Sequence, residues 1–440
     1  VMAHESFQDP EVARLMNETF ISIKVDREER PDIDMVYMTV CQMSTGSGGW
    51  PLTIIMTPDK EPFFAATYLP KETRFGNIGM LELIPRVREL WSTRQTEVLE
   101  SANQLKNARQ QQAVTTPGEE LGEADLTNTY RQLRDRFDER NGGFSSAPKF
   151  PTPHHLLFLL RHWKRTGDEQ ALFMVEKTLQ AMRQGGIYDH IGFGFHRYST
   201  DSHWLVPHFE KMLYDQALLA TAYTEAYQAT GKETYKQTAN EILTYVLRYM
   251  QSEDGGFFSA EDADSEGQEG KFYLWTLSEI REVLSQTDAD LTAKVFNLTE
   301  SGNFASEVTG RQDGNNIPHL IKPVEELAAD LNMLIADFQQ RLQVIREKLF
   351  AHREKRVHPQ KDDKILTDWN GLMLAALAQG ARALDEPRYA DAARRAADFI
   401  IKNLRKPDGR LLHRYSRGQA AIPANLDDYA FLIYGLLELY

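Results

Sequence analysis

The feature that most limits the fold of this chain is a recurrence of long amphipathic helices after residue 125. Apolar side chains recur there at helical spacing, and strand patterns almost vanish. Each helix of a first set runs into a loop that contains glycine or acidic residues, and a second helix begins after that loop. The first set is expected near 125–138, 169–184, 233–252, 333–354 and 387–404, and the second set begins near 154, 209, 277, 369 and 427.

The loops between these helices favour a closed ring of antiparallel helix pairs, the α/α toroid, over a linear solenoid. Solenoid loops are short and their repeat lengths are nearly constant. Here short connections such as Gly231-Lys232 alternate with long aromatic loops, which would gather at one end of a ring and form a cup. We count about five helix pairs in residues 125–440, so the sequence predicts an incomplete (α/α)6-type toroid whose sixth pair is expected beyond Tyr440.

The first hundred residues have a different pattern, in which helices and strands alternate. The expected order is a helix from Asp9-Pro10, a strand at 20–25, a helix at 32–43, two strands at 52–56 and 63–68, and a helix at 80–111. This order predicts a small α/β domain over residues 1–112. The polar stretch 113–124, which contains Pro117-Gly118, is expected to be a linker.

Composition excludes several classes of function. The net charge of −14 makes a nucleic-acid partner unlikely, because phosphate binding needs a basic field. The longest apolar runs are far shorter than a bilayer span, so a membrane protein is excluded. One cysteine, Cys41, allows no intrachain disulfide and no cysteine-rich metal site. The chain begins at Val1 and is expected to be cut at both ends; a cytoplasmic location is the default expectation.

Polar and aromatic residues gather in the long loops and at the starts of the helices that follow them. Aromatic platforms interleaved with carboxylates and histidines suit sugar chemistry, in which carboxylate or histidine pairs move protons. The candidate acid/base and orienting residues are His196, His208, Glu210, Asp189, Asp262 and Asp368. The candidate substrate-binding residues are Trp204, Arg197, Tyr198, Lys211, Trp369, Asn370 and Asp428. No metal site and no cofactor is predicted.

Structural explanations compete with these functional ones. Asp368 and Asp427 precede or open helices, where aspartate most often serves as an N-cap. The acidic stretch 261–266 lacks EF-hand spacing and is explained equally well as a solvated loop. Lys211 and Asp215 could form a surface ion pair. Packing alone explains residues 196–210 less well, because three histidines, an arginine and a tryptophan occur within fifteen positions.

Two features of the α/β part bear on redox chemistry. Pro51 stands directly before an expected strand and is a candidate cis-proline, although an ordinary turn proline is the default. Cys41 lies on an apolar helix face beside Met38 and Val40, which is typical of a buried, unreactive thiol.

Long motifs in both parts resemble one family. Residues 1–7 (VMAHESF), 25–32 (VDREERPD) and 48–53 (GGWPLT) resemble the thioredoxin-like half of the spermatogenesis-associated protein 20 family. Residues 198–214 and 368–373 (DWNGLM) resemble its second half, which is similar to six-hairpin glycosidase and N-acylglucosamine 2-epimerase toroids.

The resemblance implies fold more firmly than reaction. The family carries Cys-His-Trp-Cys-His before the stretch that matches Val1, and this chain lacks both that motif and the first strand of the thioredoxin fold. The resemblance also implies that Pro51 corresponds to the cis-proline that faces those cysteines. Phe193 stands where the family favours glycine, and it makes the loop before His196 bulkier.

Three functions follow as hypotheses. The first is a carbohydrate-active enzyme, an isomerase, epimerase or hydrolase, that binds a sugar or glycan in the cup. The second is a thiol-disulfide redox protein whose toroid selects the client, with a thiol client or reductase as partner of a longer protein. The third is a non-enzymatic scaffold that binds glycans or proteins.

Overall fold

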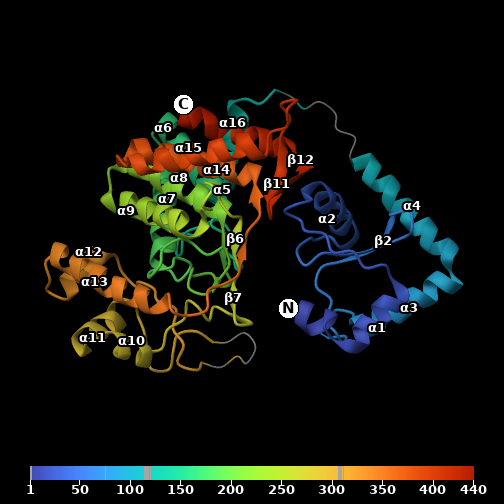
Figure 1. The fold of residues 1–440 in the computed structure, drawn as a ribbon, viewed down its shortest axis with the longest axis horizontal. Coiled ribbons are helices and arrows are strands. Elements are labelled where there is room, and N and C mark those ends of the chain that lie inside the picture. Colours follow the sequence, from blue (N-terminus) through green and yellow to red (C-terminus); the bar gives the residue numbers. More distant parts are fainter. Residues whose placement is uncertain (1, 75, 113–117, 119, 306–309, 311) are drawn as a thin grey trace. The chain divides into compact units, whose positions relative to one another are not determined.

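The computed structural model describes residues 2–440 except 75, 113–117, 119, 306–309 and 311. The chain divides into two compact units, Val1–Glu120 and Leu121–Tyr440 (Figure 1). None of the described helices is long and apolar enough to cross a bilayer.

The first unit has the mixed helix and strand content that its sequence predicts. Its elements are a π-helical turn at Ala3–Phe7, α1 (Pro10–Thr19), α2 (Pro31–Thr45), β1 (Thr53–Met56), β2 (Pro62–Ala66), α3 (Met80–Thr93) and α4 (Gln95–Gln112). The carboxylate of Asp9 caps α1 by accepting hydrogen bonds from the backbone of Glu11 and Val12, both at 3.1 Å. The expected hairpin is confirmed, since β1 and β2 pair antiparallel with Thr53 opposite Ala66.

The expected strand at 20–25 is wrong. This segment pairs with no described strand, and although Phe20 packs against the core, the other apolar side chains face solvent, with Ile21 93% and Ile23 78% exposed. A β-branched run becomes a strand only when a neighbouring strand accepts its backbone hydrogen bonds. The single helix expected over 80–111 is also divided in two at Arg94, where α3 ends and α4 begins at the next residue.

The second unit consists mainly of helices, as predicted. Its long helices are α5 (Glu123–Arg136), α6 (Pro153–Thr166), α7 (Glu169–Gln184), α8 (Leu213–Thr230), α9 (Glu233–Tyr245, continued by the π-helical Val246–Met250), α14 (Thr367–Leu384), α15 (Pro387–Asn403) and α16 (Leu426–Leu439). Helices α6, α8, α14 and α16 pack side by side, and α7, α9 and α15 pack against them from outside (Figure 1). This inner and outer arrangement is that of an α/α toroid present in part, which confirms the predicted fold class.

The inner helices are apolar on nearly every side, as a helix buried between neighbours must be. In α14 every residue from Asn370 to Ala378 is buried. Gly371 on α14 and Gly435 on α16 allow these two helices to approach closely, because a Cβ built on Gly371 would lie 2.4 Å from the backbone carbon of Phe431.

Replacing Gly371 by alanine should therefore force α14 and α16 apart. We expect Gly371→Ala to lower the free energy of unfolding by about 1–3 kcal/mol, the usual cost of overpacking. The measurement is urea unfolding followed by circular dichroism. Gly118→Ala is the matched control, because no atom of the described residues lies within 4 Å of a Cβ at Gly118. Equal stability of the two variants would contradict the close contact.

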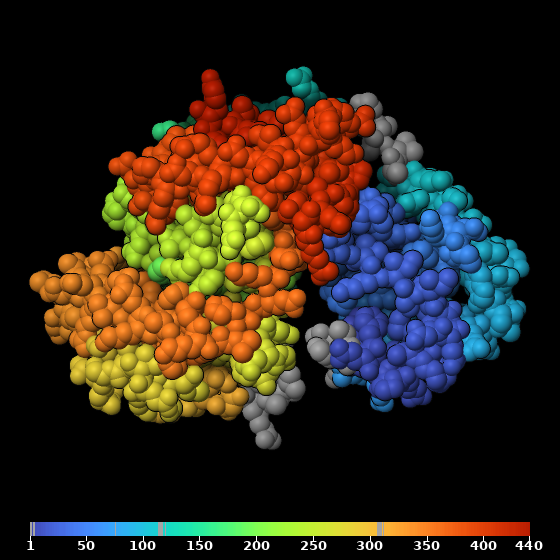
Figure 2. Space-filling view, viewed as in Figure 1, coloured from blue at the N-terminus to red at the C-terminus, as the bar shows by residue number. Residues whose placement is uncertain are grey.

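Four further helices form a separate lobe of the second unit (Figure 2). They are α10 (Leu277–Val283), α11 (Gln286–Val295), α12 (Val324–Asp330) and α13 (Ile335–Arg353). They share a hydrophobic cluster around Trp275, Phe338 and Leu349 that is distinct from the cluster of the ring helices. The helices expected near 277 and at 333–354 thus lie in this lobe, and α14 follows α8 directly among the inner helices.

Short strands in the long loops fix the starts of the inner helices. The strands are β3 (Tyr198–Ser199), β4 (Pro207–His208), β5 (Lys211–Met212), β6 (Ala260–Glu261), β7 (Asp264–Ser265), β8 (Gln268–Glu269), β9 (Lys361–Asp362), β10 (Ile365–Leu366), β11 (Leu412–Ser416) and β12 (Gln419–Pro423). Strand β6 lies between β5, which leads into α8, and β9, which precedes α14. Strand β10 leads into α14 and pairs with β11, whose partner β12 precedes α16. The three inner helices α8, α14 and α16 therefore begin at the same end of the ring.

Candidate functional site

The end of the ring at which α8, α14 and α16 begin carries two groups of titratable side chains. We call the first the His208 group; it comprises Arg197, Tyr198, His208, Glu210 and Glu269. The second, the Asp368 group, comprises Asp368, His413 and Asp428. Sequence analysis selected six of these eight residues and missed Glu269 and His413.

In the His208 group, an imidazole lies between two carboxylates. Nδ1 of His208 is 2.7 Å from Oε1 of Glu269, and Nε2 is 3.7 Å from Oε2 of Glu210. Arg197 donates to the same oxygen of Glu210 at 2.7 Å. The pairing of β3 with β4 sets Tyr198 opposite His208, and their rings stack with centroids 5.1 Å apart. The His208 side chain is 27% exposed, so it remains accessible to solvent.

Proton affinities in this group are shifted by its charges. Burial alone would lower the pKa of His208, but hydrogen bonds to Glu210 and Glu269 raise it to about 9. Burial would raise the pKa of Glu210, and its contacts with His208 and Arg197 outweigh that effect and lower it. His208 is therefore a cation at neutral pH. Among the described residues, Oδ2 of nearby Asp215 has no hydrogen-bond partner, and burial raises the pKa of this carboxyl to about 8.

This arrangement predicts a pH dependence of stability. The folded pKa of His208 lies above its unfolded value of about 6.5, so its contribution is complete below pH 6.5 and is lost as the pH rises through 9. We expect this loss to be on the order of 2 kcal/mol, because partial exposure weakens the ion pairs. Urea unfolding of wild type and His208→Gln at pH 6 and pH 9.5 measures it. The decline from pH 6 to 9.5 should be smaller in the variant by that amount, and parallel declines would contradict the assignment.

The Asp368 group brings two carboxylates and an imidazole together at the starts of α14 and α16. The ligand atoms of its three residues all lie within 4.8 Å of one another. Nδ1 of His413, on β11, lies 2.8 Å from Oδ1 of Asp428, and the backbone nitrogen of Asp368 donates to the same oxygen at 3.1 Å. Asp428 and His413 are buried, whereas Asp368 is half-buried. Burial first, and then the charge of Asp428, raise the pKa of Asp368 to about 7.

The residues of this group have the types that a cation would need, although sequence analysis predicted no metal. Oδ2 of Asp428 already accepts a hydrogen bond from the backbone nitrogen of Asn425 at 2.7 Å, and Oδ1 accepts from Asp368 and faces His413. Since both oxygens of Asp428 are engaged, the geometry suits proton sharing among the three side chains.

Aromatic residues connect the two groups. The rings of Tyr214, on α8, and Trp369, on α14, meet edge to face with centroids 4.7 Å apart. Both rings are half-buried, and Trp369 follows Asp368 in sequence. The charge of Arg197 acts on Asp215 in the first turn of α8. The groups around His208 and Asp368, which are 160 positions apart in sequence, therefore lie at one end of the inner helices, where Tyr214 of α8 meets Trp369 of α14.

Several predicted site residues lie instead in the interior. Both oxygens of Asp189 are paired: Arg353 donates to Oδ1 and to Oδ2 at 2.9 Å each, and Lys211 donates to Oδ2 at 2.9 Å. His196 is buried, with Nδ1 2.8 Å from the carbonyl oxygen of Phe209, and burial lowers its pKa well below the usual value. These residues do not join the His208 group.

Trp204, Asn370 and Asp262 also occupy places other than a pocket wall. Trp204 is 0% exposed and its Nε1 donates to the carbonyl oxygen of Asn141 at 2.9 Å, so it cannot offer a free ring face to a substrate. The amide of Asn370 bonds with the backbone of Phe257 through both its oxygen and its nitrogen. Asp262 is exposed in a turn, where it accepts from the backbone of Asp264 at 3.1 Å.

In the first unit, the peptide bond between Trp50 and Pro51 is cis, as the family resemblance implied, rather than that of the ordinary turn proline that the local pattern left as the default. The guanidinium of Arg27 lies 3.8 Å from the centre of the Trp50 ring, and Nε1 of Trp50 donates to Asp34 at 2.9 Å. Cys41 is fully buried, and its thiol hydrogen bonds with the carbonyl oxygen of Ser47 at 3.7 Å.

Comparison with known proteins defines the class of this chain. The model of the Thioredox_DsbH family, described as a protein of unknown function (DUF255), matches residues 1–110. The class is therefore a thioredoxin-like domain followed by an α/α-toroid domain. The chain is homologous over its whole length to human spermatogenesis-associated protein 20, with 39% identity, and the family predicted from the motifs is confirmed. It spans 60% of the length of that relative.

Solved structures with similar helical architecture have low identity to this chain. A family 76 glycoside hydrolase (mannosidase) from Bacteroides thetaiotaomicron aligns with a TM-score of 0.36 and 13% identity, over 66% of this chain and 54% of the other. Cellobiose 2-epimerase from Spirochaeta thermophila aligns with a TM-score of 0.28 and 14% identity, over 72% of this chain and 96% of the other.

Proposed function

We propose that the toroid domain is a sugar isomerase or epimerase that moves protons at the end of the ring where α8, α14 and α16 begin. The observation that carries this proposal is the close approach of Asp368, His413 and Asp428, whose ligand atoms lie within 4.8 Å of one another. Asp368 is half-buried, and burial together with the charge of Asp428 raises its pKa to about 7, which suits a group that both accepts and donates a proton near neutrality. Buried Asp428, held by His413, tunes this proton affinity without reaching a substrate itself.

The roles of the other residues follow from their places. His208 is an imidazolium at pH 7 and is suited to donate a proton to a sugar oxygen as a neighbouring C–H proton is removed. Glu210 and Glu269 maintain that charge. The half-buried rings of Tyr198, Tyr214 and Trp369 offer apolar faces beside these polar groups, a combination that suits a pyranose.

Hydrolysis is supported less well. Retaining and inverting glycosidases use two carboxyl groups that both reach the scissile bond or its attacking water. Asp428, which adjoins Asp368, is fully buried and hydrogen bonded, so it cannot act as a nucleophile or activate a water molecule on the sugar. The other two carboxylates of the site, Glu210 and Glu269, are both paired with His208.

The thiol-redox hypothesis gains no support from the described residues. A dithiol cycle needs two cysteines, and the single Cys41 of this sequence is buried in a helix. We therefore make no redox proposal for this chain.

The test is incubation of the protein with aldoses, ketoses and β-linked disaccharides in D2O, followed by proton NMR. Proton transfer next to a carbonyl should place deuterium at C2 when an aldose is epimerised, and at C1 when an aldose is converted to a ketose. A new reducing end without deuterium at C1 or C2 would instead identify a hydrolase. If the panel gives neither product and titration calorimetry detects no sugar binding, the proposal fails and the scaffold hypothesis gains weight.

A further inference from the structure

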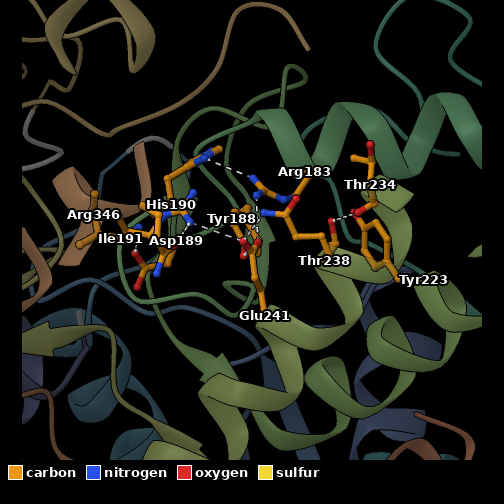
Figure 3. Close-up of polar contacts among 12 residues, drawn as sticks. Arg183, Tyr188, Asp189, His190, Ile191, Tyr223, Thr234, Thr238, Glu241 and Arg346 are labelled. Carbon is orange, nitrogen blue, oxygen red and sulfur yellow. Dashed lines mark hydrogen bonds and ion pairs between the residues drawn. The ribbon is translucent and has the colours of Figure 1, made fainter. Parts of the chain in front are cut away.

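A cavity of about 240 Å3 lies in the second unit between outer helices α7 and α9 and helices α12 and α13 of the separate lobe. No residue of the His208 or Asp368 group lines it. Part of its wall is apolar and comes from Leu179, Phe296, Leu320 and Leu342, whereas Arg183, His190 and Arg346 supply polar groups. Figure 3 shows Arg183, His190 and Arg346 together with Tyr188 and Glu241.

Arg183 is the central polar residue of this cavity. One of its terminal nitrogens donates to Oε2 of Glu241 at 2.9 Å, and the other lies 3.3 Å from Nδ1 of His190. Its Nε is buried and has no hydrogen-bond partner among the described residues, so this atom is out of a ligand's reach. The side chain as a whole lines the cavity and is 11% exposed, so an anion in the cavity can contact Arg183 through its other atoms.

The charges around Arg183 leave an excess of positive charge. Nε2 of His190 lies 3.0 Å from the carbonyl oxygen of Gly185, so it carries the proton and Nδ1 accepts from Arg183. His190 is thus neutral, in keeping with a pKa that burial and Arg183 hold well below its usual value. Arg346 donates to the carbonyl oxygen of His190 at 2.9 Å and lies 3.6 Å from Glu241. Two guanidinium groups therefore face one carboxylate.

The remaining charged residues of the wall lie toward solvent. Lys232 has a half-exposed side chain and forms an ion pair with Glu176. Glu325, on α12, is exposed. Neither one neutralises the excess charge beside Arg183.

We propose that this cavity binds a small organic anion, with its carboxylate or phosphate beside Arg183 and its uncharged part against the leucines and Phe296. A guanidinium is the preferred protein partner of both anionic groups. The cavity exceeds the roughly 150 Å3 that holds a benzene molecule and is smaller than the roughly 300–1,000 Å3 of drug-sized ligands. Its volume of about 240 Å3 therefore fits a small metabolite. This site is separate from the proposed sugar site and does not depend on it.

Titration calorimetry on the whole chain tests the proposal with three probes of similar shape. Benzoate carries a carboxylate, phenyl phosphate carries a phosphate, and benzyl alcohol carries no charge. We expect at least one anion to bind about tenfold or more tightly than the alcohol, and binding to weaken as salt is added. The tighter of the two anions distinguishes a carboxylate site from a phosphate site. Equal, or absent, binding of all three probes would overturn the proposal.

Two variants locate the binding. Arg183→Gln should weaken anion binding by about tenfold, the effect of losing one charged hydrogen bond. Leu342→Trp should block the apolar half while retaining every charge, and it replaces the first variant if loss of Arg183 prevents folding. Arg394→Gln on α15 is the matched control, because its side chain is 64% exposed and does not line the cavity. Unchanged affinity in Leu342→Trp would place the anion elsewhere and contradict the proposal.

Discussion

Asp189→Ala should unfold at a much lower urea concentration than wild type. Asp189 is the only carboxylate in direct contact with both Lys211 and Arg353 among the ion pairs of the described residues, and all three side chains are at least 96% buried. Its removal leaves the buried cations Lys211 and Arg353 without a carboxylate in direct contact among the described residues. Breaking a buried pair costs about 3–5 kcal/mol, because the remaining charge keeps its desolvation penalty. We expect a loss of stability of at least that size, measured by urea unfolding at pH 7.

The matched control is Asp391→Ala, which removes the same atoms from an exposed ion pair. Asp391 and Arg394 have side chains that are 66% and 64% exposed, and such pairs contribute little. The control should stay within about 0.5 kcal/mol of wild type. If the two variants lost equal free energy of unfolding, the ion pairs of Asp189 with Lys211 and Arg353 would not hold the loop at 189–193 against α13.

Asp368→Asn should slow sugar proton exchange by about 10²–10⁴-fold, the usual contribution of a general acid or base. The amide keeps the shape of the side chain but cannot accept the substrate proton. Asp427→Asn is the control, because Asp427 stands beside Asp428 in sequence but is exposed. Deuterium incorporation at C2 measures the rates. A normal rate in Asp368→Asn would remove this residue from the reaction.

The same assignment fixes the pH profile of kcat/KM. The reaction needs ionised Asp368, which forms above its pKa of about 7, and protonated His208, which persists below its pKa of about 9. The rate should therefore rise through pH 7 and fall through pH 9. In His208→Gln the fall at high pH should disappear.

The helical architecture could be predicted from the sequence because apolar residues recur at helical spacing along whole helices, and these are the residues that the fold buries. Helix α14 shows this agreement, since its apolar side chains continue on every face and it lies between α8 and α16. The strand expected at 20–25 was wrong because strand formation depends on a partner, which local pattern does not reveal. For Pro51 the local pattern left an ordinary turn proline as the default and the family resemblance implied a cis-proline; the Trp50–Pro51 peptide bond is cis.

The candidate site was harder to predict than the fold. Residue type and loop position led to His208, Glu210 and Asp368, but the same criteria selected Trp204 and Asp189, which are buried. Burial of a loop residue depends on contacts with distant segments, such as that between Trp204 and Asn141. Glu269 and His413 were missed because they lie in short hairpins with no hydrophobic period. The Glu266-Gly267 turn before Glu269 was the one local signal.

A double variant tests most directly whether His208 and Asp368 serve one substrate. The rate of deuterium incorporation at C2 is measured for wild type, His208→Gln, Asp368→Asn and the variant with both changes. Residues that act as a unit have strongly non-additive effects. We predict that the double variant is no more than about threefold slower than the slower single variant. A double variant whose loss equals the product of the two single losses, or a His208→Gln variant with the wild-type rate, would contradict the account.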